Sequence, residues 1–154
     1  NVEHIWDKLF SIENFEVKPI GLAARDTLRI EMGYCLYGND INELVSPIEA
    51  NLGWITKVET NFIGSESIKK QIENGIKKSL VGFIINDKGI PRKGYEIFDK
   101  SENHVGVVTS GTFSPVLKKG IGLAYIENNI SLKEIYLKIR NNLIELEVVK
   151  TPFI

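Results

Sequence analysis

The second half of the sequence alternates short β-type runs with turn-forming residues, and this pattern limits the fold more than any other feature. Six runs are rich in β-branched and aromatic residues, and clusters of Gly, Asn, Asp and Ser separate them. The runs are Leu80–Ile85, Tyr95–Phe98, Val105–Ser110, Ile121–Ile126, Ile135–Ile139 and Leu143–Val149. Asn141–Asn142 predicts a type I′ hairpin between the last two, because Asn tolerates positive φ. Short strands at regular intervals predict a small antiparallel barrel or a sandwich.

The first half of the sequence carries helical patterns. Near the start, four apolar side chains recur with i, i+3, i+4, i+7 spacing: Val2, Ile5, Trp6 and Leu9. This spacing predicts one amphipathic helix that buries its apolar face. The helix has no clear N-cap and no start methionine, so we expect a chain cut from a longer protein. The helical pattern returns over residues 21–33, where Gly33 suits the position just beyond a helix end.

The sequence between this second helix and the first β-type run is more broken. Ser46–Pro47 predicts the N-cap and first residue of a short helical turn. Trp54–Val58 alternates as a strand does. Ser65–Asn74 predicts a short helix with a serine as its cap and Gly75 as its stop.

These patterns divide the chain into residues 1–75, the tail of an α+β unit, and residues 76–154, a complete β domain. The 19 basic and 20 acidic side chains nearly cancel, which excludes a strongly basic nucleic-acid binder. The longest apolar run, Leu80–Ile85, is far too short to cross a membrane. The single cysteine, Cys35, cannot form an internal disulfide, so we expect a soluble cytoplasmic protein in a reducing compartment.

Few residues carry recognisable catalytic chemistry. The sequence has no dinucleotide fingerprint, no P-loop, no H-E-x-x-H motif and no C-x-x-C pair, and we expect no metal site. Cys35 with His4 or His104 is a candidate nucleophilic pair, although a free cysteine is more often a small buried hydrophobe. Ser110–Pro115 is either a tight connection between strands or an anion-binding loop.

Residues 21–40 have the most unusual charge pattern. The chain has only 4 arginines against 15 lysines, yet Arg25 and Arg29 lie four residues apart on one face of the predicted helix. They cannot pair with each other there. A guanidinium group suits a carboxylate or a polar heterocycle that needs two donors in a plane. The alternative is a structural role, in ion pairs with Asp26 and Glu31.

The same stretch carries a family resemblance. Gly21-Leu-Ala-Ala-Arg-Asp-Thr-Leu-Arg-Ile-Glu-Met-Gly33 and Cys35-Leu-Tyr-Gly-Asn-Asp-Ile41 closely resemble the aminomethyltransferase family of the glycine cleavage system, the T-proteins. Further blocks match in the same order, at residues 46–54, 80–83, 91–97, 106–115, 122–125 and 148–153. The resemblance covers nearly the whole chain from Gly21 onward.

The resemblance implies an activity and an architecture. T-proteins take the aminomethyl group carried on the lipoyl arm of the H-protein and pass its one-carbon unit to tetrahydrofolate, with release of ammonia. Tetrahydrofolate is thus the implied co-substrate, the H-protein is the implied partner, and no metal is implied. Folate lies in a funnel between three domains, of which the last is a small β-barrel. The implied compartment is the cytoplasm, or the mitochondrial matrix in a eukaryote.

Two site residues carry over from the resemblance. The folate-contacting arginine of the family's Ala-Arg-Asp motif falls on Arg25, and the tryptophan that lines the folate pocket falls on Trp54. A forked cation suits the polar end of folate and an aromatic face suits its rings. By the same alignment, Arg29 braces the fold. Three lysines are candidates for docking the acidic lipoyl carrier: Lys93, Lys118 and Lys119.

Other parts of the family's site have no counterpart in this sequence. The catalytic aspartate and a pocket glutamate belong to a preceding region, and a tyrosine-bearing tail follows the Pro-Phe motif. We therefore expect the C-terminal half of a T-protein, without a catalytic residue, inactive alone and partnered by the N-terminal half. Two alternatives stay open. One is the folate-dependent demethylase module of dimethylglycine or sarcosine oxidoreductases, and the other is a non-catalytic folate-binding relative.

Overall fold

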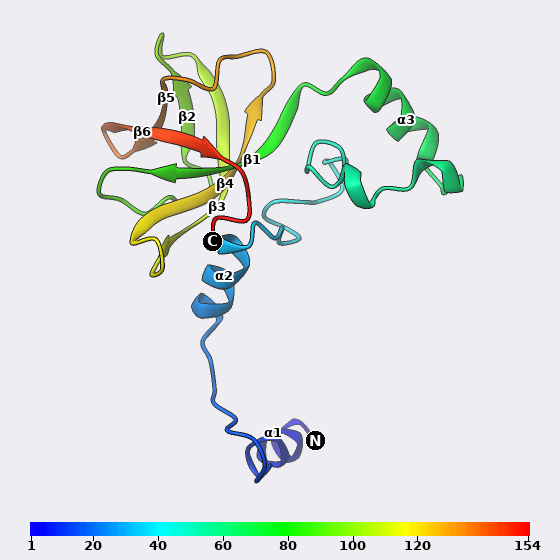
Figure 1. Ribbon diagram of the computed structural model, residues 1–154, viewed down its shortest axis with the longest axis vertical. Coiled ribbons are helices and arrows are strands. Elements are labelled where there is room, and N and C mark those ends of the chain that lie inside the picture. Colours follow the sequence, from blue (N-terminus) through cyan, green and yellow to red (C-terminus); the bar gives the residue numbers. More distant parts are fainter.

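A computed structural model describes all 154 residues and places six strands in one closed barrel (Figure 1). The strands are β1 (Lys78–Ile85), β2 (Glu96–Asp99), β3 (His104–Ser114), β4 (Lys119–Glu127), β5 (Ile135–Ile139) and β6 (Asn142–Val149). Neighbouring strands are antiparallel in the order β1-β4-β3-β2-β5-β6, and pairing of β1 with β6 closes the barrel. The predicted fold class, an α+β segment followed by a six-stranded antiparallel barrel, is confirmed.

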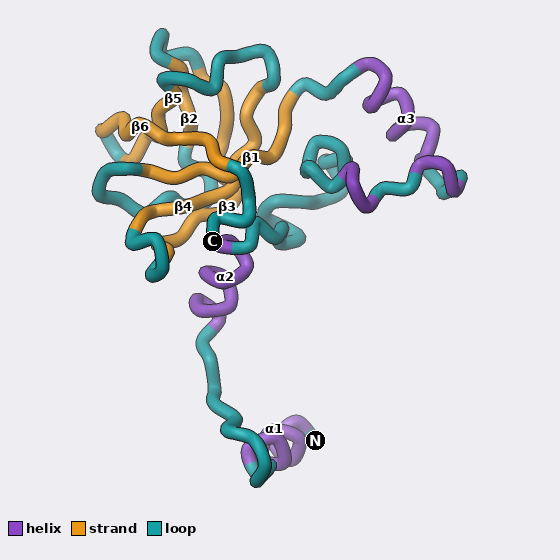
Figure 2. The backbone as a smooth tube through the Cα atoms, in the orientation of Figure 1, coloured by secondary structure: helices purple, strands orange, loops and turns teal.

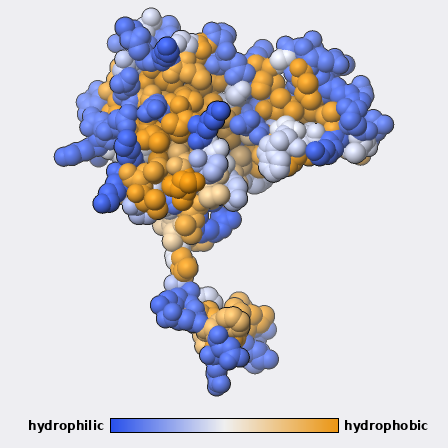
Figure 3. Space-filling view, viewed as in Figure 1, coloured by the Kyte–Doolittle hydropathy of each residue, from blue (hydrophilic) through white to orange (hydrophobic).

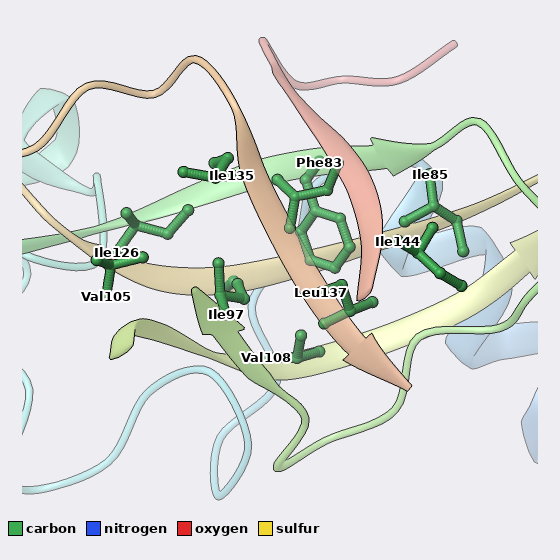
Figure 4. Packing of buried hydrophobic residues seen from close by; sticks show 11 residues of the cluster. Phe83, Ile85, Ile97, Val105, Val108, Ile126, Ile135, Leu137 and Ile144 are labelled. Atoms are coloured by element: carbon green, nitrogen blue, oxygen red, sulfur yellow. The ribbon is translucent and has the colours of Figure 1, made fainter. Parts of the chain in front are cut away.

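The barrel has its own apolar core (Figure 4). In β6, buried Ile144 and Leu146 alternate with exposed Glu145 and Glu147, which is the period-two pattern of a half-buried strand. The core cluster comprises Phe83, Ile85, Ile97, Val105, Val108, Ala124, Ile126, Ile135, Leu137, Ile144 and Leu146. Every member lies within one of the six strands, so this core takes no side chain from residues 1–77.

Two turns differ from the sequence prediction. β3 runs through Gly111–Thr112 and pairs with β4 as far as Ser114, so Ser110–Pro115 is neither a tight connection nor an anion loop. Gly111 is needed because a Cβ there would lie 2.4 Å from the carbonyl oxygen of Pro91, which marks a close approach of two segments.

The loop between β5 and β6 consists of Arg140–Asn141, one residue earlier than predicted, because Ile139 pairs with Asn142. Positive φ occurs at Arg140 and not at Asn141. The turn is therefore not of type I′, which requires positive φ at both central residues.

The first helix, α1 (Val2–Phe10), forms where the apolar spacing predicted it, but the prediction of a buried face is wrong. None of its residues is buried, and an extended segment separates it from the rest of the molecule (Figures 1 and 2). The prediction of a missing cap is also wrong, since the Asn1 side chain accepts a hydrogen bond from the Glu3 amide. The apolar face of α1 stays exposed because no other element of the chain packs on it.

Two further helices flank the segment before the barrel. Helix α2 (Leu22–Glu31) lies against β3 and β4, and Gly33 beyond its end has a φ of +71°, as the sequence predicted. Helix α3 (Ser65–Asn74) has its predicted bounds and ends at Gly75, which has a φ of +80°. Its N-cap is Gly64 rather than a serine. No helix has both the length and the apolar character needed to span a membrane.

The predicted strand Trp54–Val58 is wrong. The region forms two 3-10 turns, η1 (Gly53–Ile55) and η2 (Val58–Thr60). Thr56 explains the difference, because its amide and hydroxyl donate to the nearby carbonyl groups of Gly53 and Leu52. Such local bonds satisfy the backbone without a neighbouring strand.

The predicted cap at Ser46 forms without a regular helix behind it. The Ser46 hydroxyl accepts from the Glu49 amide at 3.1 Å, and the Glu49 carboxylate accepts from the Ser46 amide at 3.0 Å. This reciprocal pair is a capping box. The turn that it begins ends at Asn51, which has a φ of +59°.

Candidate functional site

A buried arginine fixes α2 to the barrel. The Arg29 Nη1 atom donates to Asp40 Oδ2 at 2.6 Å and to the Tyr34 carbonyl at 3.1 Å. Its Nη2 atom donates to the Ser110 hydroxyl at 2.8 Å, and its Nε atom donates to Asp26 at 2.7 Å. A planar guanidinium group can serve partners on α2, the following turn and β3 at once. The prediction that Arg29 braces the fold is confirmed.

Asp40 is the fully buried counter-ion of this arginine. Its second carboxylate oxygen accepts from the Thr109 hydroxyl, and Oδ2 also accepts from the Leu36 amide at 2.9 Å. The Tyr125 hydroxyl donates to the Asp40 backbone carbonyl at 2.9 Å. These bonds hold the turn that contains Asp40 against β3 and β4, so its position relative to the barrel is fixed.

The C-terminal part of α2 makes further contacts with the barrel and with the segment after β6. The buried Glu31 carboxylate accepts from the Ser114 hydroxyl at 2.5 Å, and the Glu31 carbonyl accepts from the Phe153 amide at 2.8 Å. The hydroxyls of Thr27 and Thr112 lie 3.0 Å apart. The helix is therefore held along its length from Thr27 onward.

Arg25 differs from Arg29 in its surroundings. It lies one turn earlier on α2, is exposed to solvent, and makes no hydrogen bond or ion pair within the chain. Because the following residues of α2 are fixed to the barrel, the backbone that carries Arg25 is also held in place. Arg25 is thus a positioned cation with free donors, which is what an anionic or polar ligand requires.

An open hollow of about 780 Å³ lies between the segment that follows α2 and the barrel. It is mostly apolar, with 12 hydrophobic residues among the 18 that line it. Trp54 is one of these residues, and 75% of its surface is exposed. Arg25 is not among the lining residues, so the structure does not bring the two predicted folate contacts into one cavity. Their folate contacts stay predictions.

Cys35 also lines the hollow, and neither histidine lies beside it. His104 packs edge-on against Phe98 with 5.8 Å between ring centroids, whereas His4 is an exposed residue of α1. Cys35 instead packs half-buried against the cluster of Leu80, Leu123 and Tyr125. The candidate Cys–His pair is therefore wrong, and the small-hydrophobe interpretation of Cys35 is the correct one.

We expect Cys35 to react with a thiol reagent only at higher pH than a free cysteine. Burial, followed by the negative charge of Asp40, raises the pKa of the thiol, and the positive charge of Arg29 opposes the shift. Because only the thiolate reacts, the rate of iodoacetamide modification should rise at higher pH in the folded chain than in the urea-unfolded chain. As the pH rises, the Cys35 thiol of the unfolded chain loses its proton before that of the folded chain. The free energy of unfolding therefore decreases above the ordinary thiol pKa. Identical pH profiles for the two states would contradict the shift.

Two of the three lysines predicted to dock a partner make side-chain hydrogen bonds within the chain. Lys93 Nζ donates to the Gly38 carbonyl at 2.7 Å and to Asn39 Oδ1 at 2.9 Å. Lys119 Nζ donates to Asn86 Oδ1 at 2.7 Å. Lys93 thus ties the turn before Asp40 to the connection between β1 and β2. No group of three or more His, Cys, Asp or Glu side chains is arranged to hold a metal ion.

Sequence reasoning missed the partners of the buried charges. Ser110 and Ser114 each bond a side chain of α2 that lies more than 80 positions earlier in the chain. Their one sequence signal is the cluster of small polar residues in Ser110–Pro115, a composition that equally suits a tight connection between strands or an anion-binding loop. Asp40 lies in the block Cys35–Ile41 that carries the family resemblance, but no local pattern marks it as the counter-ion of Arg29.

Comparisons with known proteins agree with this architecture. The family profile of the glycine cleavage T-protein C-terminal barrel domain matches residues 78–154, and that of the GCVT N-terminal domain matches residues 1–60. An aminomethyltransferase of Flavobacterium psychrophilum is 51% identical over 156 residues, which are 99% of this chain and 43% of that protein. An aminomethyltransferase of Bacteroides fragilis is 49% identical over 154 residues, covering 97% of this chain and 43% of that protein.

A solved structure shows the same fold. The crystal structure of glycine cleavage system aminomethyltransferase T from Bartonella henselae matches with a TM-score of 0.87 and 33% sequence identity, over 99% of this chain and 43% of that one. The chain thus spans less than half the length of the relatives that it matches. With one profile covering its barrel and the other its first 60 residues, the chain belongs to the glycine cleavage T-protein family.

Proposed function

We propose that this chain is part of an aminomethyltransferase, in the cytoplasm or, in a eukaryote, the mitochondrial matrix. The whole enzyme passes the one-carbon unit of an aminomethyl group on the lipoyl arm of the H-protein to tetrahydrofolate, and ammonia leaves. The observation that carries the proposal is the match to solved and curated aminomethyltransferases over nearly the whole chain. Residues 1–75 belong in this proposal to the folate-binding domain and residues 76–154 to the barrel domain, which is supported by the separate barrel core.

Arg25 and Trp54 are the proposed folate contacts. The Arg25 guanidinium is exposed and unpaired, on a helix that Arg29 and Glu31 fix to the barrel. Two parallel N–H donors match a carboxylate or the polar edge of a heterocycle. The Trp54 ring, exposed beside an apolar hollow, offers a face on which an aromatic ring system can stack. Both residues bind and orient the substrate, and neither moves a proton.

We expect no turnover by this chain alone. The residues that line the hollow include no carboxylate and no histidine, the groups that most often move protons in an active site. Positioned proton transfer typically contributes ~10²–10⁴-fold to a rate. The measurement is the formation of methylenetetrahydrofolate from aminomethyl-loaded H-protein, and turnover by the isolated chain would contradict the expectation.

The site assignment is tested by calorimetry with tetrahydrofolate. The protein is this chain joined to the part of the Flavobacterium psychrophilum relative that it does not match, which provides the full family length. We expect Arg25→Ala to weaken binding by about 10–100-fold, because a hydrogen bond to a charged group contributes about 1.5–3 kcal/mol. The matched control is Arg92→Ala, another exposed arginine, which should leave the affinity unchanged. Equal effects of the two substitutions would remove Arg25 from the site, and absence of binding by the full-length protein would overturn the proposed function.

A further inference from the structure

Exposed apolar side chains recur along the start of the chain. They cover one face of α1, follow the extended connector and reach the first residue of α2. The principal members are Ile5, Trp6, Leu9, Phe15, Ile20 and Leu22, and we call them the N-terminal strip. Figure 3 shows apolar residues on α1 and on the segment that joins it to the rest of the molecule.

No part of this chain covers the N-terminal strip. Leu22 is 84% exposed, Ile20 is 72% exposed and Trp6 is 56% exposed. The Trp6 and Phe10 rings pack on each other, 4.9 Å between centroids, and on no other element. Isolated apolar residues on a surface are ordinary, but a run of this length marks an interaction surface.

The distribution of buried residues indicates what the strip binds. Within residues 1–60, which match the profile of the GCVT N-terminal domain, only Ile30 and Ala50 are buried hydrophobic residues. A domain is stabilised by a core of its own, and two residues do not make one. The barrel, by contrast, has a complete core of eleven residues. The relatives are more than twice as long as this chain, so they contain further residues that can complete the first core.

The relatives contain a part of the aminomethyltransferase polypeptide that has no counterpart in this chain. We propose that the N-terminal strip binds this part, even when the part is supplied as a separate chain. The inference names the partner of the proposed folate site and rests on the proposed function. Residues 1–18 carry four acidic and two basic side chains, so the partner surface should be apolar with a basic rim. Because Leu22 lies one turn before Arg25 on α2, the bound partner lies beside the proposed folate contact.

The test mixes this full chain with the unmatched part of the Flavobacterium psychrophilum enzyme, expressed separately. Sedimentation velocity should show a one-to-one complex. With 5-fluorotryptophan in this chain only, the two tryptophans, Trp6 and Trp54, report separately by fluorine NMR, and Trp54→Phe identifies the Trp6 signal. The Trp6 signal should shift when the partner is added, because its ring leaves water.

Matched variants on the two faces of α1 locate the interface. Ile5→Asp should weaken the complex by about tenfold or more, because it removes a large apolar side chain from the interface and adds a charge. His4→Asp, on the neighbouring polar face, should change the affinity less than about twofold. Both variants should keep the melting temperature of the barrel, because α1 contributes no buried side chain.

Three results would overturn the proposal: no complex, equal losses for the two variants, or self-association of this chain that Ile5→Asp abolishes, since a second copy would then occupy the strip. A complex that forms but does not bind tetrahydrofolate supports the proposal and overturns the proposed function instead. The two failures are therefore distinguishable.

Discussion

Asp40→Ala is expected to lower the free energy of unfolding by about 3–5 kcal/mol, the range seen when one partner of a buried ion pair is removed. The substitution leaves the Arg29 charge buried without its counter-ion. It also removes the acceptor of the Thr109 hydroxyl and the Leu36 amide. Urea unfolding of the full chain, followed by circular dichroism, measures the loss.

Asp26→Ala is the matched control, because Asp26 pairs with the same arginine but its side chain is 42% exposed. Removing such a partner should cost about 0–1 kcal/mol. Replacing both buried charges together, with Arg29→Met and Asp40→Leu, should recover part of the stability lost in Asp40→Ala, because no unpaired charge remains. If the Asp26 and Asp40 variants lose equal stability, the buried pair is not the main attachment of α2.

Gly33→Ala is expected to cost about 2–5 kcal/mol from two independent effects. Gly33 has a φ of +71°, and a side chain in this left-handed region costs about 1–2 kcal/mol. A Cβ at this position would also lie 2.5 Å from the Thr151 Cβ, and overpacking of this kind costs about 1–3 kcal/mol. The same unfolding experiment measures the sum.

Two further variants separate the effects at Gly33. Gly38 has a φ of +88° with no atom within 4 Å of the Cβ position, so Gly38→Ala should show the backbone cost alone. Adding Thr151→Gly to Gly33→Ala should remove the steric part and leave the backbone part. A Gly33→Ala variant no less stable than Gly38→Ala would show that the contact with Thr151 relaxes without cost.

The barrel could be predicted well because its information is local. Runs such as Ile135–Ile139 have the alternation and the flanking turn residues that a strand needs, and that strand has its predicted bounds. The errors occur where a distant segment decides the conformation. Gly111 seemed to end a strand, but the strand continues through it because β4 pairs with β3 as far as Ser114. Trp54–Val58 alternated as a strand does but had no neighbouring strand to pair with, so local bonds formed 3-10 turns instead.

The site was predictable only in part for the same reason. The spacing of Arg25 and Arg29 indicated that two scarce guanidinium groups share a helix, and one of them proved structural. No local pattern could reveal that the Ser110 hydroxyl accepts a hydrogen bond from Arg29, because 81 positions separate the two residues. The folate roles of Arg25 and Trp54 came from the family resemblance and stay predictions.

The pairing of β1 with β6 has a consequence for synthesis on the ribosome. β1 is the first strand of the barrel to emerge and β6 is the last, so the barrel cannot close until the final strand is made. Until then one edge of β1 has unpaired backbone groups, and its Leu80–Ile85 run contains neither a charge nor a proline. A nascent chain that pauses before Asn142 therefore exposes an unpaired strand edge, with which another chain can pair. Pairing with β6 covers this edge, so closure of the barrel protects β1 from pairing with other chains.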